Sequence, residues 1–404
     1  MRRYLIFILI FCLCAVAGLV FLLNKKNAGK KYIAFYSLPA DTVEVLQTAL
    51  KDRFNEIEQS FEWKIIDPAL SVTEFMEKNP QTAFIFSYDN RSLFEARRFF
   101  IRHEEPVFQV LPSTFLNSIF ARDAAADTYY AFPLLIDPVK FACNAAVADT
   151  LGMRSYMTRD DLERFCRAAK GAVSFPFVCA GGEDEQLLAM ISAVAAMQGA
   201  AIAPEALSRL GKEADLHNSC PPVLKDALTV LIEWRQQGFL HPEWFRLLEN
   251  DVAVFMEFNA VALAAMPLSA SRRLKEDILQ RFTAVQVPLP PLLSKKNMPA
   301  KTIVWTQAVL GEKEKTAVID AVRAIRDFLY AQETDELLAQ ATGLAPAFSA
   351  AQTQDYEAAS GRYWVASANT TLPFFGDIVC TSAAEKARLA DGIRRYLEVD
   401  GAGY

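Results

Sequence analysis

The clearest pattern of hydrophobic and polar positions lies over residues 224–271. Apolar residues recur there at three- and four-residue steps, as on one face of a helix: Leu224, Ala227, Leu228, Leu231 and Trp234. Gly238 follows where a helix end needs left-handed backbone, and Pro242 stands where a proline can open the next helix. Residues 259–266 (NAVALAAM) form an apolar run that Pro267 ends, which predicts a strand buried on both faces. The region therefore predicts a helix, turn, helix and strand of an α/β fold.

A similar alternation follows residue 31. Residues 32–37 predict a strand, residues 43–54 a helix with an apolar position every three or four residues, and residues 61–66 a second strand. Tyr36 and Ser37 fall at the carboxyl end of the first strand, the edge where open α/β sheets bind ligands. We therefore expect Ser37 to face a ligand, and for Tyr36 both a ligand contact and core packing stay open.

Tyr88 and Asp89 follow a third predicted strand, residues 82–86. A flat aromatic face stacks on the C–H face of a sugar ring, and a carboxylate accepts hydrogen bonds from neighbouring hydroxyls. The pair therefore predicts a sugar contact, with an Asp89-Asn90 helix cap as the alternative.

Glu183 belongs to a small acidic loop, residues 180–184, between a predicted strand (172–179) and a predicted helix (185–197). The loop lacks the lysine and the spacing of a phosphate-binding loop, and its carboxylates would repel phosphate. Glu183 could accept hydroxyl groups of a ligand or cap the helix.

Residues 4–23 form an uncharged apolar run between Arg3 and Lys25. As a helix, 20 residues would be about 30 Å long, which is enough to cross a bilayer. The segment also contains Ala15-Val16-Ala17, a small-x-small pattern that a signal peptidase could cut. Both interpretations, a retained anchor and a cleaved signal peptide, predict export, and a cytoplasm-facing domain on an N-terminal anchor is the alternative.

Composition narrows the function of the rest. Six of the 42 basic residues and none of the 48 acidic ones precede Tyr32, which leaves 36 basic and 48 acidic residues and a formal charge of −12. An acidic domain binds nucleic acid and anionic membranes poorly. Five cysteines follow the apolar run without CxxC spacing, so at most two disulfides are expected. The three histidines are not at ligand spacing, so we expect no metal site and no cofactor.

Three stretches resemble the extracellular solute-binding proteins of ABC importers, in the sugar-binding family that includes maltose-binding proteins. They are WRQQGFLHPEW with AVALAAMPLSASRRL, TYYAFPLLIDPVKFACN, and EKEKTAVIDAVRAIRDFLYAQETDELLAQATGLAPAFSA. The last is the most specific match, and the likeness runs in order through residues 32–350. Leu268 and Cys143 stand where the family has aromatic residues, and Asn259-Ala260 stands where it has Gly-Lys.

The resemblance implies a two-lobe periplasmic-binding-protein fold of the class II type, with mixed sheets flanked by helices and a hinge of two or three crossings. We expect residues 1–31 as the signal peptide or anchor, 32–137 with 268–328 as the first lobe, and 138–267 with 329–404 as the second. Asp137 would face the cleft at a crossing, or form a turn with Pro138. Trp305 matches a family tryptophan that could stack a sugar ring, or be buried in the core.

The implied function is capture of a small solute, a sugar or oligosaccharide, by hinge closure between the lobes, followed by delivery to an ABC permease. It requires no catalytic residue and places the protein in the periplasm or on the outer face of the cytoplasmic membrane. A sensor subunit of the same fold would share every feature used. An exported carbohydrate-active enzyme is the less favoured alternative, because no G-x-S-x-G motif or histidine-based triad is present.

Overall fold

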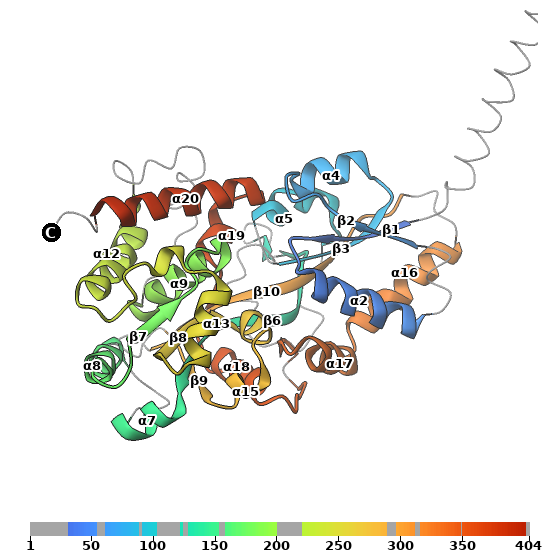
Figure 1. The fold of residues 1–404 in the computed structure, drawn as a ribbon. Helices are drawn as coiled ribbons and strands as arrows, with labels where there is room; N and C mark the ends of the chain where they lie inside the picture. The colour runs from blue at the N-terminus through green and yellow to red at the C-terminus, as the bar shows by residue number, and fades with distance from the viewer. Residues whose placement is uncertain are drawn as a thin grey trace, which may run out of the picture.

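Two long strands, β6 (Phe132–Asn144) and β10 (Asn297–Gln307), run between the two halves of the molecule (Figure 1). They pair antiparallel, and the register places Asp137 opposite Lys301. The computed structural model describes residues 31–54, 61–88, 91–102, 122–123, 128–152, 158–199, 220–288, 296–311, 316–348 and 350–400. The predicted apolar segment, residues 4–23, and Asp89 lie outside these ranges.

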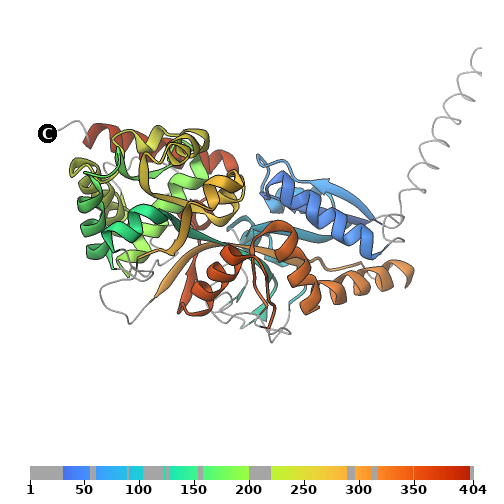
Figure 2. The same ribbon diagram turned by 60° about the horizontal axis from the view of Figure 1, so that its bottom comes forward.

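The first half is built on the strand order β2-β1-β3-β10-β6, in which β1 pairs parallel with β2 and β3. Helices cover both faces of this sheet (Figures 1 and 2). The remaining elements of this half are β1 (Lys31–Tyr36), α2 (Ala40–Arg53), β2 (Phe61–Ile65), α4 (Val72–Lys78), β3 (Thr82–Tyr88), α5 (Arg91–Glu95), the 3-10 helix η1 (Arg97–Phe99), β4 (Arg122–Asp123), β5 (Thr128–Tyr129), α16 (Thr316–Leu329), α17 (Gln332–Thr342) and β11 (Ala345–Pro346).

The second half continues the sheet from β6 through β8 to β7, and β9 also pairs with β6. The β8 strand is buried along its whole length, antiparallel to β6 and parallel to β7. The elements of the second half, in chain order, are α7 (Ala145–Leu151), α8 (Arg159–Ala169), β7 (Phe175–Cys179), α9 (Asp184–Met197), α12 (Pro222–Gln236), the 3-10 helix η2 (Trp244–Arg246), α13 (Glu249–Glu257), β8 (Val261–Pro267), α14 (Leu268–Ser271), α15 (Glu276–Leu279), β9 (Phe282–Gln286), α18 (Tyr356–Ala366), β12 (Thr370–Leu372), α19 (Phe375–Val379) and α20 (Ala383–Asp400).

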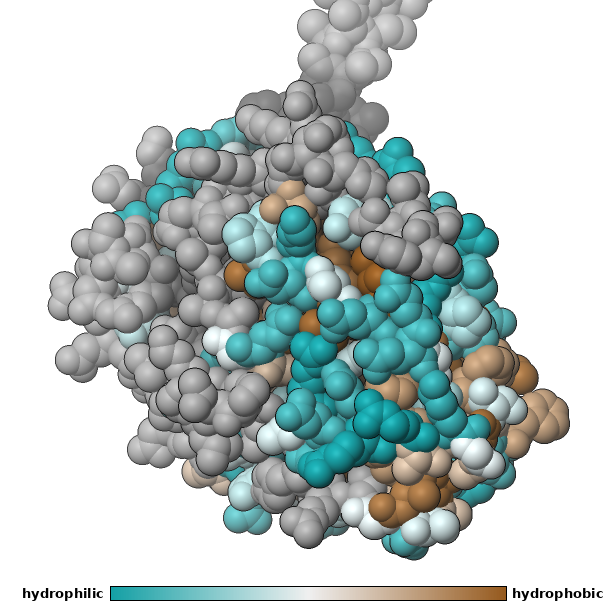
Figure 3. All heavy atoms as spheres, turned by 90° about the vertical axis from the view of Figure 1, so that its left-hand side faces the viewer, coloured by the Kyte–Doolittle hydropathy of each residue, from teal (hydrophilic) through white to brown (hydrophobic). Residues whose placement is uncertain are grey.

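Each half has its own core. In the first, one cluster lies between the sheet and α2, α16 and α17, and another lies on the opposite face against α4 and α5. In the second, a large cluster joins α8, α9, α12 and α20 to the sheet, and a smaller one lies under α13 and α15. On the outer end of the second half, the described residues are mostly hydrophilic, with hydrophobic residues in small groups (Figure 3). Two separate cores joined by shared strands make a two-lobed α/β architecture.

The sequence pattern over residues 224–271 predicted most of the elements that form there. The predicted helix is α12, and its Leu224, Leu228 and Trp234 are buried. Gly238 has a φ of 65° in the left-handed region, as its position after the helix requires. Pro242 is followed by η2, a short 3-10 helix, in place of the predicted α-helix.

Two stretches pack with a different half from the one to which the predicted boundaries assign them: residues 268–286 (α14, α15 and β9) lie in the second half, and residues 332–346 (α17 and β11) lie in the first. Leu338 and Ala339 of α17 belong to the core cluster beneath α2 in the first half. The β9 strand, Phe282–Gln286, pairs with the end of β6 in the second half. These placements depend on contacts between distant segments, which hydrophobic periodicity does not encode.

The five cysteines of the described residues are all free thiols: Cys143, Cys166, Cys179, Cys220 and Cys380. Burial raises the pKa of Cys143 to about 12, so this thiol stays protonated and unreactive at neutral pH. Within the described ranges, no helix combines the length and the apolar character needed to span a membrane.

Asp335 provides a test of the first core. Its side chain is 1% exposed and accepts a hydrogen bond of 2.6 Å from the backbone N–H of Phe348. Burial raises the pKa of Asp335 to about 8, against the opposing effect of the N–H groups of Phe348 and Ala347. The folded chain therefore holds a proton that the unfolded chain releases near pH 4, and stability falls as the pH rises from about 4 to about 8.

We expect Asp335→Asn to raise the free energy of unfolding by about 2 kcal/mol at pH 8, with a smaller gain at pH 5, because the amide needs no proton to stay neutral. Urea denaturation at several pH values measures this. Asp52→Asn, at an exposed position of α2, is the control and should change neither value. An equal effect of Asp335→Asn at both pH values would contradict the assignment.

Candidate functional site: a cavity at the strand crossing

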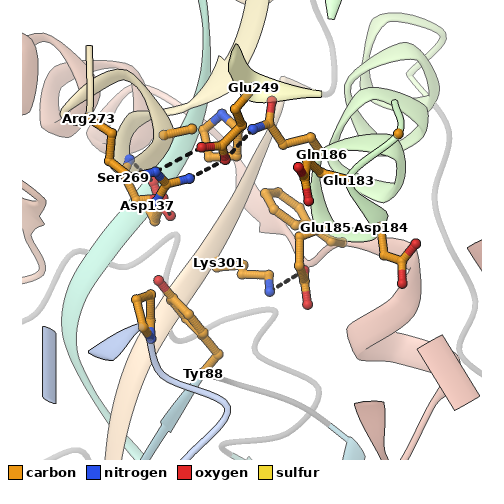
Figure 4. A pocket seen from close by; sticks show the side chains of 15 residues that line it. Tyr88, Asp137, Glu183, Asp184, Glu185, Gln186, Glu249, Ser269, Arg273 and Lys301 are labelled. Atoms are coloured by element: carbon orange, nitrogen blue, oxygen red, sulfur yellow. Dashed lines mark hydrogen bonds and ion pairs between the residues drawn. The ribbon is translucent and has the colours of Figure 1, made fainter. Parts of the chain in front are cut away.

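A cavity of about 460 Å³ lies where β6 and β10 pass between the halves. The first half contributes Pro39 before α2 and Tyr88 at the end of β3, and the crossing strands contribute Asp137 and Lys301 (Figure 4). The second half contributes the remaining lining: Gly182, Glu183, Asp184, Glu185, Gln186, Glu249, Pro267, Ser269, Ala270, Arg273 and Phe374. Groups from both halves therefore surround one space.

Asp137 is held at the crossing by the chain that follows β8. One of its oxygens accepts a 2.9 Å hydrogen bond from the backbone N–H of Ser269, and the other accepts a 2.5 Å bond from the Ser269 hydroxyl. The side chain is 2% exposed, and burial raises the pKa of Asp137 even though both bonds to Ser269 oppose the change. The carboxyl group is thus fixed in orientation on the cavity wall.

Lys301 lies opposite Asp137 on β10, and its charge is compensated from the second half. Its ammonium forms an ion pair with Glu185 of α9 and lies 3.7 Å from an oxygen of Asp377 in α19. Lys386 of α20 completes the group, 3.1 Å from Glu185 and 2.5 Å from Asp377.

Burial by itself would raise the pKa of Glu185, but the two ammonium groups outweigh it and hold that pKa below its usual range. Burial also acts to lower the pKa of Lys386, and the carboxylates of Asp377 and Glu185 raise it further than burial lowers it. Glu185 and Lys386 are therefore charged, and the ion pairs of the cluster join β10 to three helices of the second half.

Arg273, Glu249 and Gln186 form a second polar group on the wall. The guanidinium of Arg273 donates through two nitrogens to the two oxygens of Glu249, one of the bonds being 2.9 Å long. Gln186 donates to Glu249 at 2.6 Å. This two-point pairing orients the planar groups and leaves the Arg273 charge neutralised.

The loop before α9 is placed by close backbone contacts. The N–H of Gly181 donates to the carbonyl of Trp244 at 3.0 Å, and that of Gly182 donates to the carbonyl of Leu247 at 2.8 Å. Arg394 of α20 clamps the other side, donating to the Gly182 carbonyl and to Asp184 at 2.8 and 2.7 Å. The first turn of α9 is therefore fixed against the cavity.

Two aromatic rings flank Lys301 in the cavity. Its ammonium nitrogen lies 4.7 Å from the centroid of the Tyr88 ring and 5.5 Å from that of Phe374. Tyr88 is 3% exposed, and burial, followed by the charge of Asp137, raises the pKa of its hydroxyl well above the usual value. Tyr88 therefore presents a neutral phenol to the cavity.

Three of the predicted site residues meet on this cavity: Tyr88, Asp137 and Glu183. Glu183 occupies the N-cap position of α9, but its side chain makes no capping hydrogen bond. Its carboxylate is therefore left to face the cavity, and a ligand contact by these three residues remains a prediction.

The other predicted residues lie elsewhere. Tyr36 is 1% exposed in the core against α4 and α5, and its hydroxyl donates to the Thr381 carbonyl at 2.9 Å. Trp305 is 1% exposed and packs with Phe132, their ring centroids 4.9 Å apart. These two placements correspond to the core alternatives. Ser37 is not part of the lining and has left-handed backbone with a φ of 55°.

Sequence reasoning missed several lining residues, namely Glu185, Gln186, Glu249, Arg273, Lys301 and Phe374. The sequence did hold a signal, a charged residue next to a buried run. Lys301 precedes the apolar residues 303–305 of β10, and Glu185 lies in the first turn of α9, directly before its buried residues. Among the described residues, no group of three or more histidine, cysteine, aspartate or glutamate side chains is arranged to hold a metal ion.

Comparison with known proteins adds the fold class. No protein-family model matches the sequence. No curated protein matches it either. Solved structures do: a binding protein of Bacillus subtilis in an open conformation is 13% identical, with a TM-score of 0.65 over 92% of this chain and 97% of the other.

A chitin oligosaccharide binding protein is also 13% identical, with a TM-score of 0.62 over 93% of this chain and 100% of its own. The solute-binding protein RafE in complex with raffinose is 13% identical, with a TM-score of 0.61 over 92% and 100% of the two chains. The chain therefore has the two-lobe fold of solute-binding proteins, as the sequence predicted, and the cavity lies between its lobes.

The charge cluster of Lys301, Glu185, Asp377 and Lys386 predicts a stability change. Lys386→Met leaves Glu185 and Asp377 with one ammonium in place of two, and Asp377 is 1% exposed. We expect the free energy of unfolding to fall by about 3 kcal/mol, since an uncompensated buried charge is strongly unfavourable. In urea denaturation, Lys386→Met combined with Asp377→Leu should lose less than the single variant. Additive losses would show that the two charges do not compensate each other.

The glycine loop predicts a steric effect. A Cβ atom at Gly182 would lie 2.7 Å from the carbonyl oxygens of Arg246 and Leu247. We expect Gly182→Ala to displace the loop and lower stability by about 2 kcal/mol, measured by thermal unfolding. Gly171→Ala is the matched control, because nothing lies within 4 Å of a Cβ there. Equal midpoints for the two variants would refute the close-contact argument.

Proposed function

We propose that this protein is the substrate-binding component of an ABC importer and captures a sugar or oligosaccharide in the cavity between its lobes. The observation that carries the proposal is the cavity itself, in which groups from both halves and from the crossing strands surround one space. A ligand that touches both halves stabilises the arrangement in which they are close. The neighbours that bind chitin oligosaccharide and raffinose support a sugar as the ligand.

The lining has the chemistry that sugars need. Carboxylates and the Gln186 amide offer hydrogen-bonding groups for hydroxyls, and Tyr88 and Phe374 offer apolar ring faces. The ligand contacts proposed from sequence that fit this space are those of Tyr88, Asp137 and Glu183. Capture requires no catalytic residue, and the structural neighbours are binding proteins.

Delivery to a membrane permease is the second part of the proposal. The apolar residues 4–23 would export the chain and either be cleaved or anchor it, so that the lobes lie outside the cytoplasmic membrane. A sensor subunit with the same fold would bind the same ligand without transport. Stimulation of a reconstituted permease ATPase by the liganded protein separates the two functions, since a sensor subunit would not stimulate it.

Ligand binding is tested by thermal unfolding of the purified protein against mono- and oligosaccharides, polyols and amino acids. A sugar at a hundredfold excess over its dissociation constant should stabilise the folded state by about 2.7 kcal/mol. Chemical analysis of the recovered sugar should show it unchanged, whereas turnover would favour the enzyme alternative.

The matched variants are Tyr88→Leu, in the cavity, and Tyr356→Leu, at a position of α18 that is 68% exposed. Only Tyr88→Leu should abolish the shift. Stabilisation by no sugar in the panel would count against the proposal.

A further inference from the structure

The cations at the cavity are already neutralised. Arg273 is bound to Glu249 through two nitrogens, and Lys301 is paired with Glu185. Behind the wall, Lys386 lies between Glu185 and Asp377, and Arg394 is 2.7 Å from Asp184. Among the described residues of this wall, no ammonium or guanidinium group is therefore left to receive a carboxylate or phosphate of a ligand.

Carboxylates are in excess at the same place. The described lining carries five carboxyl groups, on Asp137, Glu183, Asp184, Glu185 and Glu249, against two cations. Glu183 has no ion pair or hydrogen bond from its side chain within the described part of the chain, and Asp137 is bonded only to the uncharged Ser269. Even with Lys386, Arg394 and Asp377 counted, two carboxyl groups remain without a cation of their own.

The hydroxyl of Tyr88 is a separate indication that the cavity holds a ligand. The side chain is 3% exposed and lines the cavity (Figure 4). Among the described residues, its hydroxyl makes no hydrogen bond and is not one of the wholly buried polar atoms, so its oxygen is open to the cavity. A ligand with a hydrogen-bonding group at this point would satisfy it.

We propose that the solute is a sugar that carries a protonated amine, with its ammonium group at Glu183 and its hydroxyls near Tyr88 and Asp137. This proposal rests on the proposed function and narrows its ligand class. Sugar acids and sugar phosphates are disfavoured because the wall would repel them. An ammonium donates three hydrogen bonds and offsets the excess negative charge, which a neutral hydroxyl cannot do.

The test compares amino sugars with their neutral counterparts on the full-length protein at mildly acidic pH. Isothermal titration calorimetry with glucosamine and glucose, galactosamine and galactose, and the glucosamine disaccharide and cellobiose forms matched pairs. We expect the amine of at least one pair to bind about tenfold more tightly, as for a partly desolvated charge pair. Equal or tighter binding of the neutral member in every pair overturns this inference and leaves the proposed function standing.

Glu183→Gln should remove most of the preference for the amine, because it deletes the charge and keeps the shape. Glu333→Gln, an exposed first-turn glutamate of α17, is the matched control and should keep the preference. Should Glu183→Gln fail to fold, the salt dependence of binding to the unaltered protein decides. Amine affinity should fall with ionic strength more than neutral-sugar affinity, and equal salt dependence overturns the inference. Binding of neither sugar class would overturn the proposed function as well.

Discussion

The compensation of the Lys301 charge is the interaction on which the site depends. An ammonium group on a strand that is buried almost throughout is tolerated only where carboxylates lie beside it. Those carboxylates, Glu185 and Asp377, come from helices of the second half. Meeting this requirement draws α9, α19 and α20 against β10, and the first turn of α9 then forms one wall of the cavity. The need to compensate the Lys301 charge on β10 therefore also sets the position of this cavity wall.

The opposite wall depends on register. Antiparallel pairing places Asp137 directly across from Lys301, so that both side chains lie on one face of the sheet. A slip of one residue in either strand would turn the side chain of that strand away from the cavity. Because β6 and β10 belong to both halves, the groups at their crossing lie where the two halves join. Pro39 and Tyr88 line one side of the cavity and Glu183 lines the other. A ligand that bridges them would shift the balance between open and closed forms by its difference in affinity for the two.

Prediction of the site from sequence succeeded where a residue's neighbours along the chain identify its position. Tyr88 follows a strand, and Glu183 lies in a loop before a helix, so their location at a sheet edge could be inferred. Prediction failed where the partner of a residue is distant in the sequence. Lys301 forms an ion pair with Glu185, more than a hundred residues away, and Arg273 forms one with Glu249, which precedes the β8 strand. Trp305 and Tyr36 took the core alternative that the sequence left open, since an aromatic residue at a strand end fits a core as well as a ligand.

The sequence by itself determined the elements and the fold class. Periodicity specified the helices and the buried strand, Gly238 marked a helix end by its left-handed backbone, and the order of short motifs indicated two α/β lobes. These features are local, because propensity and side-chain period act over a few residues. Tertiary structure alone decided that α17 joins the first core, that β9 pairs with the end of β6, and which charges neutralise one another. Those outcomes depend on which distant segments pack together in the low-dielectric interior. Packing, and not position in the chain, decides which opposite charge lies beside each buried charge.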